Sequence, residues 1–125
     1  SLFAGPLTGN RSNLTAVADL ARALHKPFML AEASPHGLGV VNGTQSWGQW
    51  FDPVFTFIRD YDVRAFCYIN CNWDDPEMWQ FNTLGWNDAR IQTNAIVQSL
   101  WLQKMAATNF LHASTNLFRI LGYDS

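Results

Sequence analysis

Charged side chains are scarce in this sequence. Asp, Glu, Lys and Arg make up 14% of its 125 residues, against roughly 25% in an average soluble domain. The eight basic residues are scattered along the chain, and the net charge is -2 with a pI near 5.8. A protein that binds nucleic acid usually carries a clustered basic face. The sequence therefore predicts no nucleic-acid partner.

Long apolar runs are also missing, as are the motifs of nucleotide and serine-nucleophile sites. No run reaches the ~18 apolar residues that a membrane span needs, so no membrane partner is predicted. The chain contains neither a glycine-rich phosphate loop nor the G-x-S-x-G elbow of serine hydrolases. These absences leave a globular chain, with 48% hydrophobic residues, that is predicted to need no cofactor.

Patterns that bind metals are equally weak. The three histidines lack zinc spacing, and they are His25, His36 and His112. An EF-hand loop starting at Asn70 would need Gly at its sixth position and Glu at its twelfth, where the chain has Asp75 and Phe81. No metal is predicted, although a looser site at Asp74 and Asp75 stays open.

The chain has two cysteines, Cys67 and Cys71, four residues apart in the sequence. On one strand they would lie about 13 Å apart. A disulfide requires Cα atoms within about 7 Å, so the two are not expected to form one.

Tryptophan is abundant, in contrast. Flat aromatic faces are what sugar rings stack against, so this content favours a carbohydrate site, although Trp101 is expected to fill the core. The six tryptophans are Trp47, Trp50, Trp73, Trp79, Trp86 and Trp101.

Three triplets match the acceptor pattern for N-glycosylation, and they begin at Asn10, Asn13 and Asn42. Such acceptors are used in secreted chains, so we expect a secreted, extracellular glycoprotein. The chain opens at Ser1 in what reads as mid-protein sequence, and it is therefore expected to be a fragment or a processed product.

Hydrophobic periodicity predicts helices that alternate with buried strands. The expected order is a helix over 14–24, an apolar strand over 28–31 ending in Glu32, a helix over Ser46–Arg59, a strand over Val63–Asn70 and a long helix over 88–113, with Asp88 as its expected N-cap. Alternation of this kind implies a parallel sheet. Two strands alone cannot form a parallel sheet covered on both faces, so neighbouring strands are expected outside this chain.

Glu32 is one of only two glutamates, and it ends an otherwise apolar strand. A carboxylate in such a place is costly unless it is paired or hydrogen-bonded. In a barrel, the carboxyl end of a strand is where catalytic groups are presented. Two interpretations stay open at this point: a catalytic acid, or a structural acid satisfied by loop N–H groups or an arginine. His36 follows in the same loop, where it can line the same pocket or serve as an ordinary loop residue.

Several segments resemble clan-A retaining glycoside hydrolases, and most closely family 26, which contains β-mannanases. The segment 26–32 resembles the seventh barrel strand of that clan, which ends in the nucleophile. The segment 63–73 resembles the eighth, which often ends in a substrate-stacking tryptophan, and 86–91 resembles the entry to the eighth helix. The resemblance implies an α/β fold: residues 1–125 would be the C-terminal portion of one (β/α)8 catalytic domain.

The same resemblance implies a retaining β-glycoside hydrolase of the endo-β-glycanase or mannanase type that acts on a polysaccharide. Glu32 would be the nucleophile. The acid/base carboxylate would belong to strand four, in the N-terminal part of the same barrel, so this chain alone is expected to be inactive. The expected sugar-binding residues are Trp73, His36, Trp47, Asn70, Trp79 and Tyr68.

Two other functions fit the same residues. The first is a non-catalytic carbohydrate-binding protein on a barrel remnant, with Trp73, Trp79 and Trp47 as stacking platforms. The second is a structural α/β segment whose tryptophans belong to the core.

Overall fold

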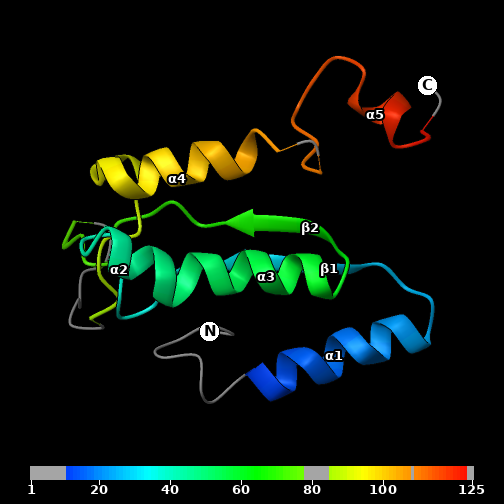
Figure 1. Ribbon diagram of the computed structural model, residues 1–125, viewed down its shortest axis with the longest axis horizontal. Coiled ribbons are helices and arrows are strands. Elements are labelled where there is room, and N and C mark those ends of the chain that lie inside the picture. The colour runs from blue at the N-terminus through cyan, green and yellow to red at the C-terminus, as the bar shows by residue number, and fades with distance from the viewer. Residues whose placement is uncertain (1–10, 78–84, 108, 124–125) are drawn as a thin grey trace.

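The computed structural model describes residues 11–77, 85–107 and 109–123, and it has the predicted order of helix, strand, helix, strand, helix (Figure 1). Two short elements were not predicted: a 3-10 turn before the last long helix, and a final helical turn. The elements are α1 (Arg11–Ala23), β1 (Phe28–Ala33), α2 (Thr44–Ser46), a π-helical turn (Trp47–Phe51), α3 (Asp52–Asp60), β2 (Val63–Tyr68), a 3-10 turn (Ile91–Thr93), α4 (Ala95–Met105) and α5 (Leu117–Ile120).

The two strands are neighbours and run parallel, as predicted. The chain passes from one to the other through α2, the π-helical turn and α3, which follow each other without a break over residues 44–60. In Figure 1 this helical segment lies along the strands, with α1 and α4 on either side of it. The arrangement is a βαβ unit, in which the carboxyl ends of both strands lie at the same edge of the sheet.

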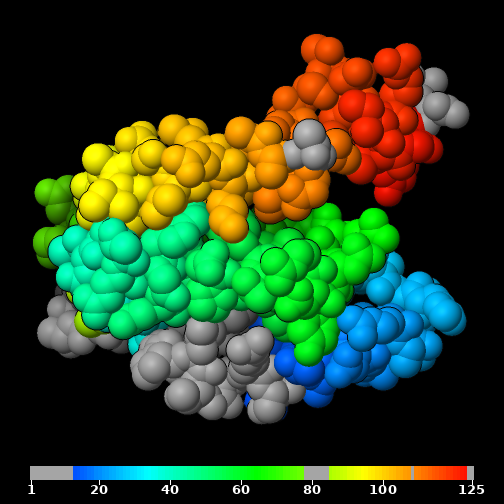
Figure 2. Space-filling model, in the orientation of Figure 1, coloured from blue at the N-terminus to red at the C-terminus, as the bar shows by residue number. Residues whose placement is uncertain are grey.

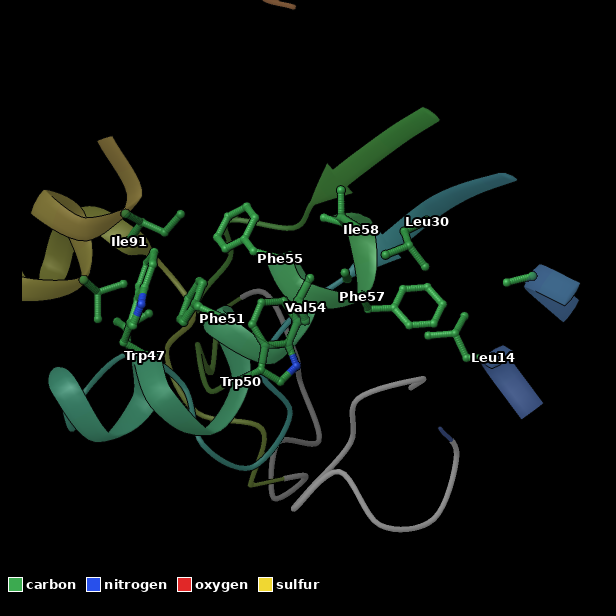
Figure 3. Close-up of a cluster of buried hydrophobic side chains, with 14 residues drawn as sticks. Leu14, Leu30, Trp47, Trp50, Phe51, Val54, Phe55, Phe57, Ile58 and Ile91 are labelled. Atoms are coloured by element: carbon green, nitrogen blue, oxygen red, sulfur yellow. The ribbon is translucent and has the colours of Figure 1, made fainter. Parts of the chain in front are cut away.

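The core lies between the strands and the crossover helix (Figure 3). Trp50 and Phe51 are almost completely buried, and from β1 Leu30 packs into the same cluster. Full burial of one such side chain contributes roughly 1.5–3 kcal/mol. This cluster therefore holds the crossover helix against one face of the sheet.

The other face of the sheet is open in the described part of the chain. Met29 and Glu32 on β1 and Cys67 on β2 are exposed there, while Leu30 and Ala33 are buried on the side of the helices. Cys67 and Cys71 are both free thiols. β2 ends at Tyr68, so Cys71 lies beyond the strand, and the two thiols form no disulfide with each other, as expected.

The last long helix is shorter than predicted. It begins after Asn94, whose side chain accepts hydrogen bonds from the backbone N–H groups of Ile96 and Val97, and it ends at Met105. Asp88, the expected cap, instead binds the backbone and side chain of Arg90. A short polar side chain can hydrogen-bond its own backbone two residues on and so compete with helix formation.

Residues 109–123 form a lobe, drawn in orange and red, that extends beyond the end of α4 (Figure 2). Several apolar side chains in this lobe are exposed, among them Leu111, Phe118 and Ile120. Among the described residues, no helix combines the length and the apolar character that a transmembrane segment requires.

Candidate functional site

Glu32 lies at a bulge near the carboxyl end of β1. Leu30 pairs with Phe66 and Ala33 pairs with Tyr68, so three steps along β1 match two along β2. Strict alternation from the buried Leu30 would turn Glu32 toward the helices. The extra residue shifts this alternation, and Ala33 becomes the next buried side chain while Glu32 stays exposed. Bulges are frequent beside active sites because they redirect a side chain in this way.

The Glu32 carboxylate has no ion-pair partner among the described residues. The five ion pairs found there join other side chains, and most lie at the surface: Arg22–Asp19, Arg59–Asp60, Arg64–Asp62, Arg90–Asp88 and Lys104–Asp52. In one form of the structural interpretation Glu32 pairs with an arginine, but no arginine of the described residues forms an ion pair with it.

An aromatic group that we call the aromatic wall lies at the loop that follows Glu32: Trp73, Trp86 and His36. The ring centroids of Trp73 and Trp86 are 5.0 Å apart, and the His36 ring meets Trp86 edge-on at 4.2 Å. Ser34, two residues after Glu32, accepts a hydrogen bond from the indole N–H of Trp73 at 2.7 Å. The structure thus brings Trp73 to the loop that follows Glu32 and contains His36. Both residues were predicted from the sequence as sugar-binding residues.

The segment that carries Trp86 is tied to the end of β2. Asn72 and Asp88 form an isolated antiparallel bridge, and the Ala89 N–H donates to the carbonyl of Cys71 at 3.0 Å. The Asp74 carboxylate accepts a hydrogen bond from the Asn87 backbone N–H at 3.0 Å. Asp74 therefore anchors this loop. In the described part of the chain, no group of three or more His, Cys, Asp or Glu side chains could hold a metal ion.

The loop after β1 meets the same segment at Gly39. A Cβ atom at this position would lie 2.5 Å from the carbonyl oxygen of Asp88, and the residue has a φ of +57°. Glycine alone combines this conformation with so close a backbone approach. The Val40 N–H donates to the same carbonyl at 2.9 Å, so the two loops are held together at Asp88, two residues after Trp86.

Two of the predicted sugar-binding residues belong to the core, and those predictions were wrong. Trp47 is only 8% exposed and stacks on Phe51 at 5.1 Å, so neither face of its indole is open to a sugar. Tyr68 faces the helices, where its ring contacts Trp50 and Trp101. Its hydroxyl donates to the carbonyl of Ala89 at 2.5 Å. Burial, with a smaller contribution from the Asp88 charge, raises the pKa of the Tyr68 phenol well above its usual value.

Asn70 is exposed, but both ends of its amide are engaged. Its oxygen accepts from the Ile91 backbone N–H at 2.8 Å, and its nitrogen donates to the Gln92 side chain at 3.0 Å. These bonds fix the 3-10 turn ahead of α4. Asn70 thus supports the site, and a sugar contact through its second amide N–H stays a prediction.

The remaining predictions divide by position. Trp79 and Asn10 lie outside the described residues. Asn13 and Asn42 are exposed, as glycosylation acceptors must be.

Sequence reasoning missed Ser34 and Trp86 as site residues. Their only sequence signal was position, since one follows Glu32 in the same loop and the other precedes the polar pair Asn87–Asp88.

Comparison with known proteins shows similarity along the whole chain. All of it aligns with the β-1,3-xylanase TXYA of a Vibrio species, at 29% identity over 146 residues. A β-1,3-xylanase of an Alcaligenes species aligns with 98% of the chain, also at 29% identity. The chain spans about a third of the length of these relatives, 32% and 30% respectively. No family model matches it.

Proposed function

We propose that the whole protein is a retaining glycoside hydrolase that cleaves β-1,3-linked xylan, and that Glu32 is its nucleophile. The observation that carries the activity is the similarity, along the entire chain, to two β-1,3-xylanases. The role of Glu32 is supported by its place at the carboxyl end of a parallel strand, exposed at a bulge beside the aromatic wall. Since the names of the relatives specify a xylan, we propose xylan ahead of the mannan that the sequence resemblance suggested.

The fold proposed for the whole protein is a (β/α)8 barrel in which β1 and β2 are the seventh and eighth strands. Helices cover one face of this pair, as they do on the outside of such a barrel. The exposed face, with Glu32 and Met29, would then line the interior. The other strands of the barrel would complete the sheet and bring the acid/base carboxylate of strand four to the same end.

In the proposed reaction, a Glu32 carboxylate oxygen attacks the anomeric carbon while the glycosidic C–O bond breaks. The carboxylic acid of strand four gives its proton to the leaving oxygen. The carboxylate left on strand four then takes a proton from water, and that water displaces Glu32 from the sugar. Retention of configuration requires the two carboxyl groups to lie about 5–5.5 Å apart.

The test is Glu32→Gln in the full-length protein, with the matched variant Glu77→Gln at the only other glutamate of the chain. Loss of a nucleophile that works together with a second group is expected to lower kcat at least about a thousandfold on β-1,3-xylan. Glu77→Gln should keep the wild-type rate, since Glu77 is exposed in the loop beyond β2.

A mechanism-based fluoroglycoside inhibitor gives a second readout, because it should leave a covalent adduct on the peptide that contains Glu32. Near-normal hydrolysis by Glu32→Gln would refute the nucleophile assignment. Binding of xylan by the wild-type protein with no hydrolysis would favour a carbohydrate-binding protein instead. Hydrolysis of β-1,4-xylan or mannan ahead of β-1,3-xylan would overturn the substrate assignment.

A further inference from the structure

Ser34 joins the loop of the proposed nucleophile to the aromatic wall. The residue is 6% exposed, and its hydroxyl oxygen accepts the indole N–H of Trp73 at 2.7 Å. An indole nitrogen is a donor only, whereas a serine hydroxyl both donates and accepts. Truncation at position 34 would remove the acceptor of this bond and leave a part-buried donor unsatisfied, which disfavours the present orientation of the ring.

The orientation of Trp73 is therefore defined on two sides. Ser34 holds the nitrogen edge of the indole, and Trp86 packs against the ring at 5.0 Å with an angle of 49° between the planes. Trp86 is itself held by the edge of His36 and by its carbonyl oxygen, which accepts from the Gly37 N–H at 3.2 Å. The groups named here that hold these two rings, Ser34, His36 and Gly37, all belong to the loop after β1.

The link to Glu32 is short and stiff. Between Glu32 and Ser34 lies only Ala33, which is buried, pairs with Tyr68 and accepts the Ile69 N–H at 2.9 Å. A displacement of Ser34 relative to Glu32 would have to break this pairing. The backbone of Glu32 and the Trp73 ring are thus tied to each other through three consecutive residues.

We propose that Ser34 is a positioning residue that sets the Trp73 ring in register with Glu32, so that a sugar stacked on the indole presents its anomeric carbon to the carboxylate. The inference rests on the proposed function. Ser34 touches neither substrate nor reacting atoms in this assignment, and it acts only through the indole N–H.

Kinetics of Ser34→Ala in the full-length protein give the first test. Loss of one buried acceptor should raise KM for a β-1,3-xylooligosaccharide about tenfold. Because the sugar is then less well aligned, kcat should fall too, but far less than in Glu32→Gln, since the acid pair is intact. Ser34→Thr keeps the hydroxyl and should restore KM to within about twofold of the wild-type value. An unchanged KM in Ser34→Ala would overturn the proposal.

A double-mutant cycle separates positioning from a general structural role. Trp73→Phe removes the indole N–H, so adding Ser34→Ala in that background should change KM by less than about twofold. If Ser34→Ala raises KM by the same factor with Trp73 as with Phe at position 73, Ser34 acts through some other contact and the proposal fails. If Trp73→Phe alone leaves KM unchanged, the indole N–H does not set the position of a sugar-binding ring, and the proposal fails although Glu32 can still be the nucleophile.

Circular dichroism supplies a readout that is independent of activity. Two indoles 5.0 Å apart couple their transitions, so Trp73→Phe and Trp86→Phe should each remove a Trp–Trp exciton band. Ser34→Ala should weaken this band and Ser34→Thr should retain it. A band of wild-type size in Ser34→Ala would show that Trp73 keeps its orientation without the hydroxyl, which refutes the positioning role even if the protein hydrolyses no xylan.

Discussion

Four of the five tryptophans that the structure describes fall into two groups that differ in place and in surroundings. Trp47 and Trp50 belong to the crossover helix and are 8% and 2% exposed, packed among phenylalanine and tyrosine rings. Trp73 and Trp86 lie in the loop after β2, only partly buried, next to Ser34 and His36. The same residue type thus fills the core in one region and forms a surface beside Glu32 in the other.

The difference shows that the position of a tryptophan in the sequence, and not the number of tryptophans, indicates which of them belong to the candidate site. A tryptophan at helical spacing among apolar residues is drawn into the core, since burial of its large ring is worth more than any surface contact. A tryptophan placed after a strand, among short polar residues, has no apolar cluster to enter. Its ring stays partly open and its N–H finds a polar partner, as Trp73 does at Ser34.

The largest effect expected from this comparison is on stability. Trp50→Ala should lower the free energy of unfolding by about 3–5 kcal/mol, because a large cavity opens in the core. Trp86→Ala should cost only about 1–2 kcal/mol, the value of two aromatic pairs. Urea unfolding of both variants in the full-length protein measures the contrast, and equal losses would break the division into two groups.

Changes within the helical layer should affect stability without affecting hydrolysis. Asn94 caps α4 by accepting from the N–H groups of Ile96 and Val97. Asn94→Ala should therefore cost about 1 kcal/mol of unfolding free energy, with KM for xylooligosaccharide unchanged. Gln98→Ala, at an exposed position of the same helix, serves as the control and should be close to neutral. A raised KM in Asn94→Ala would show that α4 is coupled to the aromatic wall.

Sequence reasoning predicted the elements well because each has its own periodicity. The apolar run before Glu32 and the spacing of apolar residues over Ser46–Arg59 depend only on neighbours in the chain. The beginning of α4 was predicted wrongly, because the Asp88 side chain is engaged by Arg90 and Asn94 caps the helix instead. Such competition is decided in three dimensions.

The candidate site was predicted only in part. Glu32 stood out as a lone acid in an apolar run, whereas the bulge that turns it away from the helices depends on the register with β2. Trp47 was misassigned because its aromatic character suggested stacking on sugar, while the stacking on Phe51 comes from a helical spacing of four residues. Ser34 could not be found, because its partner lies 39 residues away.

The smallest expected effect lies at the carboxyl edge of the sheet, in the Asp88–Arg90 pair that precedes α4. The Arg90 guanidinium donates two hydrogen bonds to the Asp88 carboxylate, at 3.0 and 2.8 Å, and lowers the pKa of Asp88 below its usual value, although partial burial opposes the shift. A carboxyl group with a lowered folded-state pKa stabilises the fold above its unfolded pKa of about 3.9. That contribution is lost as the pH falls through the lowered value.

Asp88→Asn should therefore destabilise the full-length protein at pH 7 by less than Asn94→Ala does, because the Arg90 side chain is 41% exposed and water screens the pair. The gap to the wild-type protein should narrow as the pH falls below the unfolded pKa of about 3.9 and through the lowered pKa of folded Asp88, and it closes once Asp88 is protonated in both states. Asp60→Asn, which breaks an exposed pair with Arg59, should be neutral at both pH values. Urea midpoints measured from pH 7 to pH 2.5 test this. A gap that persists in acid would mean that Asp88 holds the Trp86 segment through its hydrogen-bond geometry and not through its charge, as Ser34 is proposed to hold Trp73.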